Sequence, residues 1–237
     1  LMVSQWGPRK NTANSIKWFV EKFKDNPDVG LIVKTFFKNN CTMDGLHVEN
    51  MLKTFAAEDI KCKLYLIHGD MSDNEMIGLY SHPKVKALIS LSHGEGFGLP
   101  LFEASYTGLP IVTTNWSGQC DFLNVPTKVR KKGAKKKTQT VMKPLFGEVE
   151  YSLGPIQKEA VWEGVLQPES MWCYADAASF KNIIQDVFSD YDKYKEMAKK
   201  LKTYIQKELE ANKQYDAFAN AVYPAQEVNE PEVVSFD

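Results

Sequence analysis

The residues best suited to chemistry lie in one segment, residues 92–104, with the sequence SHGEGFGLPLFEA. Three alternating glycines are followed by Pro100, and seven residues separate two carboxylates, Glu95 and Glu103. The apolar run at 85–91 is typical of a buried strand, and the residues from Pro100 to Gly108 favour a helix. A strand, a glycine-rich turn and a helix N-terminus form an anion cradle, because free N–H groups and the positive end of the helix dipole face one place.

The two carboxylates narrow the class of anion. We expect Glu95 in the loop and Glu103 on the first turn of the helix, so that both face one ligand from its two ends. Carboxylates accept hydrogen bonds from hydroxyls and repel phosphates. A nucleotide sugar has both groups: the N–H groups would hold its diphosphate, and the carboxylates its ribose diol and sugar hydroxyls. A plain surface turn with solvated glutamates explains the glycines but gives neither acid a role.

The composition is that of an ordinary globular chain. Its 237 residues are 43% hydrophobic and 25% charged, which allows one large or two small domains with a sizeable core. A net charge of −1 gives no electrostatic basis for binding nucleic acid. The four cysteines lack metal-ligand spacing and are interpreted as free thiols of a reducing, cytoplasmic compartment. Neither a membrane-spanning run nor a secretory signal is recognisable. Because the sequence opens almost directly on a strand, we expect a piece of a longer enzyme or a minimal domain.

The elements that must position the segment alternate along the chain. We expect strands and helices in turn at residues 1–4, 12–24, 30–37, 48–57, 64–67, 73–80, 85–91, 100–106 and 110–114, in that order. Ser72 and Glu75 have the spacing of a capping box at the start of the third helix. This alternation predicts a Rossmann-like, doubly wound parallel sheet. Ligands bind beyond the carboxyl ends of such strands, where the loops after Val3, Ile67 and Leu91 would meet.

Residues 1–124 resemble the donor-binding half of retaining GT-B glycosyltransferases of the family-4 type. The resemblance is carried by the Glu-x7-Glu segment with its Glu-Gly-Phe-Gly-Leu-Pro core, a Pro-x-Lys turn ending at Lys10, Gly69 with the capped helix, and the run Gly108-x-Pro-Ile-Val. It implies an α/β fold that is the C-terminal half of a GT-B enzyme. A small-residue loop, 115–119, follows where the family has one near the donor.

The resemblance also implies roles for individual residues. Glu95 would act at the reacting sugar, and the implied donor-binding residues are Gln5, Arg9, Lys10, His93, Gly96, Phe97, Gly98, Leu99 and Glu103. Of these, the N–H groups of residues 96–99 would meet the diphosphate and sugar, Lys10 the diphosphate, and Glu103 the ribose. The base would lie near residues 69–72. No metal or other cofactor is implied.

Three of these residues have alternatives. The family usually has an arginine where this chain has Gln5, so either Arg9 compensates for the missing charge or the donor is held more weakly. The alternative for Arg9 is a surface residue without a role in binding, and the alternative for Lys10 is a solvated surface lysine. His93 could touch the donor or serve as a structural histidine at the end of a strand.

The second half of the chain departs from this pattern. We expect one domain over residues 1–222, with a basic insertion at about 125–145, and an acidic, disordered tail over 223–237. Seven basic residues and no acid lie between Lys128 and Lys137, which favours a mobile loop. The alternative is a weak contact with an anionic partner or a membrane surface. Residues 146–151 are interpreted as a strand or hairpin, and helices are expected from Asp176 and over 194–209.

Taken together, the sequence predicts the donor-binding domain of a glycosyltransferase. An N-terminal acceptor-binding domain has no counterpart in the chain, so we expect it to bind a nucleotide-diphosphate sugar and to transfer poorly to its acceptor, which the sequence does not identify. One alternative is a stand-alone module that binds a nucleotide sugar, or scaffolds a partner, without turnover. Another is a GT-B-like epimerase or phosphorylase.

Overall fold

The computed structural model describes residues 1–56, 59–130 and 138–223. The strands of the main sheet are β1 (Met2–Val3), β2 (Gly30–Lys34), β3 (Lys63–Ile67), β4 (Leu88–Ser90), β5 (Ile111–Thr114) and β8 (Gly147–Val149). The helices are α1 (Thr12–Phe23), α2 (Thr42–Lys53), α3 (Asp73–Ser81), α4 (Leu99–Thr107), α5 (Cys120–Leu123), α6 (Ala177–Ser189), α7 (Tyr191–Glu208) and α8 (Ala211–Val222), with a short 3₁₀ helix at Lys158–Ala160.

The six strands run parallel in a doubly wound order. Two ladders, β1-β2-β3 and β4-β5-β8, are each parallel. They meet where the Ile89 N–H donates to the Leu1 carbonyl at 2.8 Å, so β1 lies beside β4. The spatial order is therefore β3-β2-β1-β4-β5-β8, and the direction of winding changes between β1 and β4. In such sheets the crevice beyond the carboxyl ends of these two strands is the usual ligand site.

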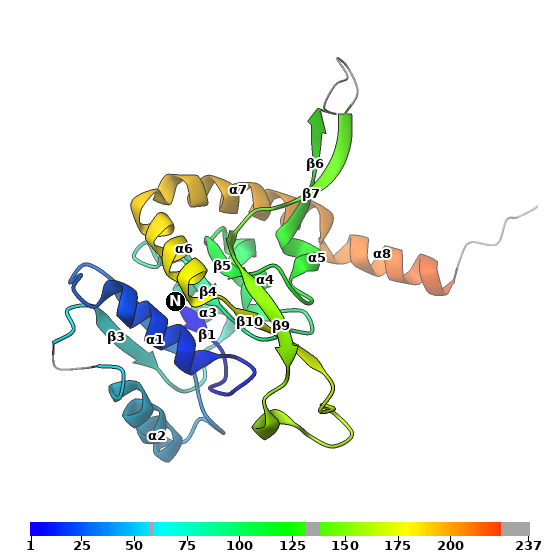
Figure 1. Ribbon diagram of the computed structural model, residues 1–237. Coiled ribbons are helices and arrows are strands. Elements are labelled where there is room, and N and C mark those ends of the chain that lie inside the picture. Colours follow the sequence, from blue (N-terminus) through cyan, green and yellow to red (C-terminus); the bar gives the residue numbers. More distant parts are fainter. Residues whose placement is uncertain (57–58, 131–137, 224–237) are drawn as a thin grey trace, which may run out of the picture.

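Both faces of the sheet are covered, because neighbouring residues of a strand point to opposite sides. Leu31, Val33 and Val112 enter a core with the buried faces of α1 and α6, which pack against each other (Figure 1). Leu88 and Ile111 enter a second core with α3, α4 and α7. The Rossmann-like fold expected from the sequence is confirmed.

Several local predictions are confirmed and one is wrong. The Ser72–Glu75 capping box is formed at the start of α3, and the first helix runs from Thr12 as expected. The second helix begins at Thr42 rather than at residue 48. The expected strand around 146–151 becomes β8 followed by β9 (Tyr151–Pro155), which pairs antiparallel with β10 (Met171–Ala175).

The described parts of the basic insertion are strands. Its two sides form an antiparallel hairpin, β6 (Asn124–Arg130) and β7 (Thr138–Pro144), that projects from the body of the molecule, as does α8 (Figure 1). Alternating β-branched residues such as Val125 and Thr127 account for the strands. Residues 131–137 and residues 224–237 lie outside the described residues, so the mobile loop and the anionic contact expected over Lys128–Lys137 both stay predictions.

None of the helices in the described ranges combines the length and the apolar character needed to cross a bilayer.

Candidate functional site

Two loops meet at the carboxyl ends of β1 and β4. We call residues 4–11 the β1 loop and residues 92–98 the glycine loop. The His93 N–H and the Ser92 hydroxyl both donate to the Arg9 carbonyl, at 2.8 and 3.2 Å, and these bonds join the two loops. Within the β1 loop, Asn11 takes the left-handed conformation (φ 52°) immediately before α1. This turn directs the side chains of Arg9 and Lys10 towards the glycine loop.

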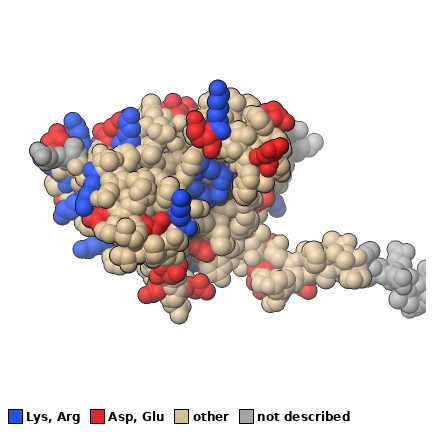
Figure 2. Space-filling model, turned by 90° about the horizontal axis from the view of Figure 1, so that it is seen from below, with Lys and Arg blue, Asp and Glu red and all other residues tan. Residues whose placement is uncertain are grey.

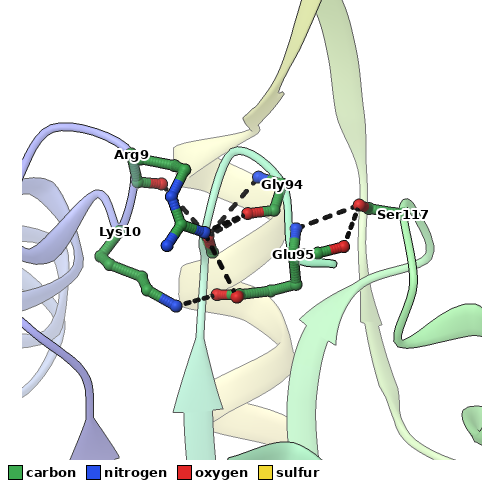
Figure 3. Close-up of polar contacts among 6 residues, drawn as sticks. Arg9, Lys10, Gly94, Glu95 and Ser117 are labelled. Atoms are coloured by element: carbon green, nitrogen blue, oxygen red, sulfur yellow. Dashed lines mark hydrogen bonds and ion pairs between the residues drawn. The ribbon is translucent and has the colours of Figure 1, made fainter. Parts of the chain in front are cut away.

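Glu95 is the centre of the polar contacts between these loops (Figure 3). Its carboxylate lies 2.5 Å from the Lys10 ammonium and 3.3 Å from the Arg9 guanidinium, and only 10% of its side chain is exposed. The same Arg9 nitrogen donates to the Gly94 carbonyl at 2.6 Å. Two cations and one carboxylate are therefore held together at the crevice, with one positive charge in excess.

A third loop, after β5, fixes the backbone of Glu95. The Glu95 N–H donates to the Ser117 hydroxyl at 3.0 Å, and that hydroxyl donates to the Glu95 carbonyl at 2.6 Å (Figure 3). The Gly118 N–H donates to the same carbonyl at 3.0 Å. A Cβ atom at residue 118 would lie only 2.0 Å from the Gly96 carbonyl oxygen. Glycine is therefore required here so that the two backbones can approach.

The glycine loop ends at the N-terminus of α4. Gly98 precedes the helix in the left-handed conformation (φ 88°), which a glycine adopts without strain, and no side chain caps the helix. The first N–H groups of a helix lack intrahelical partners and carry the positive end of its dipole. The residues predicted to bind phosphate through their backbone, Gly96, Phe97, Gly98 and Leu99, thus surround a helix N-terminus next to Lys10, as an anion cradle requires.

Glu103 has a different environment from the one expected. It lies on the second turn of α4, not the first, because the helix begins at Leu99. Its carboxylate accepts a hydrogen bond of 3.0 Å from the Tyr80 hydroxyl of α3. Burial, together with the negative charge of Glu103, raises the pKa of Tyr80, so this hydroxyl stays a donor. The two glutamates thus contact different partners.

His93 lies in the interior beneath the glycine loop. Its side chain is 2% exposed, its Nδ1 lies 2.6 Å from the Cys173 carbonyl, and its ring stacks on Trp172 of β10 with a centroid distance of 5.0 Å. Burial lowers the pKa of His93, which keeps the ring neutral with Nδ1 as the donor. In the described part of the chain, Nε2 has no hydrogen-bond partner. These contacts fit a structural role for His93 at the end of the strand. Its contact with a sugar donor stays a prediction.

A hollow of about 250 Å³, the inner hollow, opens beside these groups. Its lining residues come from the ends of β1 and β2 and the start of α4: Val3, Ser4, Gln5, Lys10, Lys34, Phe36 and Pro100. Lys34 donates to the Gly69 carbonyl at 2.7 Å, which ties the predicted base region to this edge. Gln5 donates to the Phe37 carbonyl at 2.9 Å, so it holds the β1 loop as well as lining the hollow.

Figure 2 shows the face seen from below in Figure 1, where basic and acidic side chains are interspersed and one group of basic side chains lies near the middle. In the residues that the structure describes, no cluster of three or more His, Cys, Asp or Glu is placed to hold a metal ion.

Sequence reasoning missed the groups that connect distant segments. It did not foresee Ser117 as the brace of Glu95, Lys34 at the inner hollow, or the contact of Trp172 with His93. The small Ser117–Gly118 pair was a usable signal, since small residues mark a close backbone approach. The stacking of Trp172 joins residues 79 positions apart, and one sequence carries no signal for it.

The fold is that of the C-terminal half of a GT-B glycosyltransferase, and comparison with known proteins agrees. Residues 1–126 match the family described as glycosyl transferases group 1, and the chain belongs to that family. It is 30% identical over 113 residues to the serotype-specific mannosyltransferase WbdA of Escherichia coli. That match covers 47% of this chain but only 13% of WbdA.

Two solved structures have the same fold. The C-terminal domain of LpcC, a glycosyl transferase group 1 family protein from Francisella tularensis, superposes with a TM-score of 0.52 at 15% identity, covering 89% of this chain and 85% of that one. Anabaena HepE in complex with UDP-glucose gives a TM-score of 0.56 at 14% identity, covering 93% of this chain and 48% of HepE. At this identity the likeness concerns the fold.

Proposed function

We propose that this chain is the donor-binding part of a retaining, family-4 type glycosyltransferase that uses a nucleotide-diphosphate sugar. The observation that carries the proposal is the meeting of Arg9, Lys10 and Glu95 at the uncapped N-terminus of α4, beside the inner hollow. An N-terminal domain would complete the enzyme by holding the acceptor and excluding water.

The diphosphate would lie between the glycine loop and the β1 loop. The N–H groups of residues 96–99 would donate hydrogen bonds to its oxygens, and Lys10 and Arg9 would turn from Glu95 to the phosphates. Arg9 already contacts the glycine loop, so it can supply the charge that Gln5 lacks. The same groups stabilise the charge that develops on the diphosphate as it leaves. The proposal assigns this task to the protein and to no metal.

The sugar and the nucleoside would extend in opposite directions from the diphosphate. Glu95, fixed by Ser117, would accept hydrogen bonds from the sugar hydroxyls near the reacting carbon. Glu103, with Tyr80 as its partner, would accept from the ribose diol, and the base would reach the Lys34–Gly69 region. A mannosyltransferase relative and the UDP-glucose bound to HepE support a hexose donor.

The experiment compares two lysine variants in nucleotide titrations by calorimetry. UDP, GDP and ADP are titrated first, and the diphosphate that binds is then compared with its monophosphate. Lys10→Met should weaken diphosphate binding on the order of 10- to 100-fold, because a charge-assisted hydrogen bond is lost, and should reduce the advantage over the monophosphate. The matched control is Lys17→Met on α1, whose side chain is 60% exposed, and it should bind as the parent chain does.

Equal affinities for the two variants would contradict the proposed role of Lys10. If none of the three nucleotides binds, the donor-site proposal fails and a scaffold module without turnover becomes the better hypothesis.

A further inference from the structure

The turn that follows β5, residues 115–118, has a strained backbone, and we call it the Ser117 turn. Ser117 has a φ of 73°, which is in the left-handed region that residues with a side chain rarely adopt. Among the described residues, Asn11 is the one other non-glycine residue with a positive φ, and asparagine tolerates this conformation better than serine. Strain of this kind persists only where the surroundings fix it, and it gathers at functional sites. The turn therefore needs both a constraint that holds it and a use that retains it.

Asn115 supplies the constraint at the start of the turn. Its Nδ2 donates to the Glu148 carboxylate at 3.0 Å. Its Oδ1 accepts hydrogen bonds from the Asn124 amide at 2.9 Å and from the Cys120 thiol at 3.3 Å. The Tyr151 hydroxyl donates to the Asn115 carbonyl at 3.4 Å. These partners lie on α5, β6, β8 and β9, so four elements fix the turn.

Glu95 is the residue that the turn holds. In the described part of the chain, the backbone of Glu95 takes its hydrogen bonds from Ser117 and Gly118 (Figure 3). The left-handed conformation places the Ser117 hydroxyl where it accepts from the Glu95 N–H and donates to the Glu95 carbonyl. The carboxylate of the same residue is held by Lys10 and Arg9 instead. The backbone and the side chain of Glu95 thus have separate supports.

These two supports would part when a donor binds. In the proposed function Lys10 and Arg9 turn to the diphosphate, which leaves the Glu95 carboxylate without its cations while it accepts hydrogen bonds from the sugar. The hydrogen bonds to its backbone are then what keeps it in place.

We propose that Ser117 is a positioning residue, whose strained turn holds Glu95 at the sugar in the donor-bound site. The inference rests on the proposed function and adds a distinction to it. The turn supports the contact with the sugar, whereas the diphosphate depends on Lys10 and on the N–H groups of residues 96–99. Loss of the Ser117 hydroxyl should therefore weaken the binding of the sugar more than the binding of the nucleotide.

The test compares each nucleotide diphosphate with its sugar by calorimetric titration of the full chain. The ligand pairs are UDP with UDP-glucose, GDP with GDP-mannose and ADP with ADP-glucose. For a pair that binds, the sugar ratio is the affinity for the nucleotide sugar divided by the affinity for the diphosphate. Ser117→Ala should lower this ratio about three- to tenfold, the effect of one lost hydrogen bond, and should leave the affinity for the diphosphate near that of the parent.

The matched control is Ser179→Ala. The Ser179 hydroxyl also accepts a hydrogen bond from the backbone N–H of a glutamate, Glu150, at 2.9 Å, but it lies on α6, away from the glycine loop. This variant should keep the sugar ratio of the parent chain.

Ser117→Gly separates the strain from the hydroxyl. Glycine adopts a φ of 73° freely, whereas alanine keeps the strain of serine. Ser117→Gly should therefore lower the sugar ratio as Ser117→Ala does, yet unfold at a higher urea concentration than Ser117→Ala. It also keeps the test valid if the alanine variant does not fold.

The inference is overturned if a folded Ser117 variant keeps the sugar ratio of the parent. It is also overturned if the nucleotide sugar and the diphosphate weaken equally, because the turn would then only support the glycine loop. If none of the three nucleotides binds to the parent chain, the proposed function fails instead.

Discussion

Gly118 is the position where one methyl group should disable the site. A Cβ atom there would lie 2.0 Å from the Gly96 carbonyl oxygen, 2.6 Å from its carbonyl carbon and 3.0 Å from the Glu95 carbonyl oxygen. These neighbours are backbone atoms, so no side chain can rotate away. In Gly118→Ala the glycine loop must therefore retreat by about 1 Å to restore a tolerable contact.

That retreat has two measurable effects. Overpacking of this kind costs about 1–3 kcal/mol of unfolding free energy. The displaced loop also carries Glu95 and the N–H groups of residues 96–99 away from Lys10. A displacement near 1 Å can lower the reaction rate of a positioned site by about 100-fold. We expect a comparable effect on binding, so nucleotide diphosphate affinity should fall about 10- to 100-fold. Urea unfolding measures the first effect and calorimetric titration the second.

Gly78→Ala in α3 is the matched control. No atom lies within 4 Å of a Cβ at residue 78, so alanine should fit, gain up to about 1 kcal/mol of stability as a better helix former, and bind nucleotide normally. A folded Gly118→Ala chain with the parent's affinity would refute the reasoning, because it would mean that the position of the glycine loop does not govern binding.

Two further predictions concern the support of the site. Because burial lowers the pKa of His93 below its ordinary 6.5, the unfolded state binds the proton more tightly. Stability should therefore fall as the pH drops below 6.5, by at most about 1.4 kcal/mol per pH unit from this group, and His93→Phe should remove this slope in urea unfolding, whereas His82→Gln should not. Phe122 is fully buried, and its ring packs against that of Phe97 in the glycine loop with a centroid distance of 5.1 Å. Phe122→Ala should cost about 3–5 kcal/mol in the same assay, and a cost below 1 kcal/mol would contradict its place in the core.

Regular patterns allowed much of the fold to be predicted. The strand-helix alternation, the capping box at Ser72 and the glycine loop before Pro100 all follow from local rules, and the structure contains them. The start of α2 was missed because Gly45 interrupts the expected helical pattern near it. There Asp44 accepts hydrogen bonds from the N–H groups of Phe37 and Lys38, so the start of the helix is held by the loop that precedes it.

The site could be predicted only as a set of residues. The family resemblance points to Lys10 and Glu95, but no local pattern indicates that they form an ion pair, nor that the Glu103 carboxylate accepts a hydrogen bond from Tyr80. The two strands that flank the basic segment 131–137 were not predicted, because the charge of this region outweighs its strand pattern. The hairpin's backbone pairing stabilises β6 and β7 at positions where the side chains alone would favour solvent.

The most direct test of the central claim is amide NMR mapping of the chain with UDP-, GDP- and ADP-sugars. The account predicts that one of them perturbs the amides of residues 4–10 and 96–99 together, in a single binding event. Perturbations confined to other surfaces, or none with any of the three, would contradict a nucleotide-sugar site at the meeting of the β1 loop and the glycine loop.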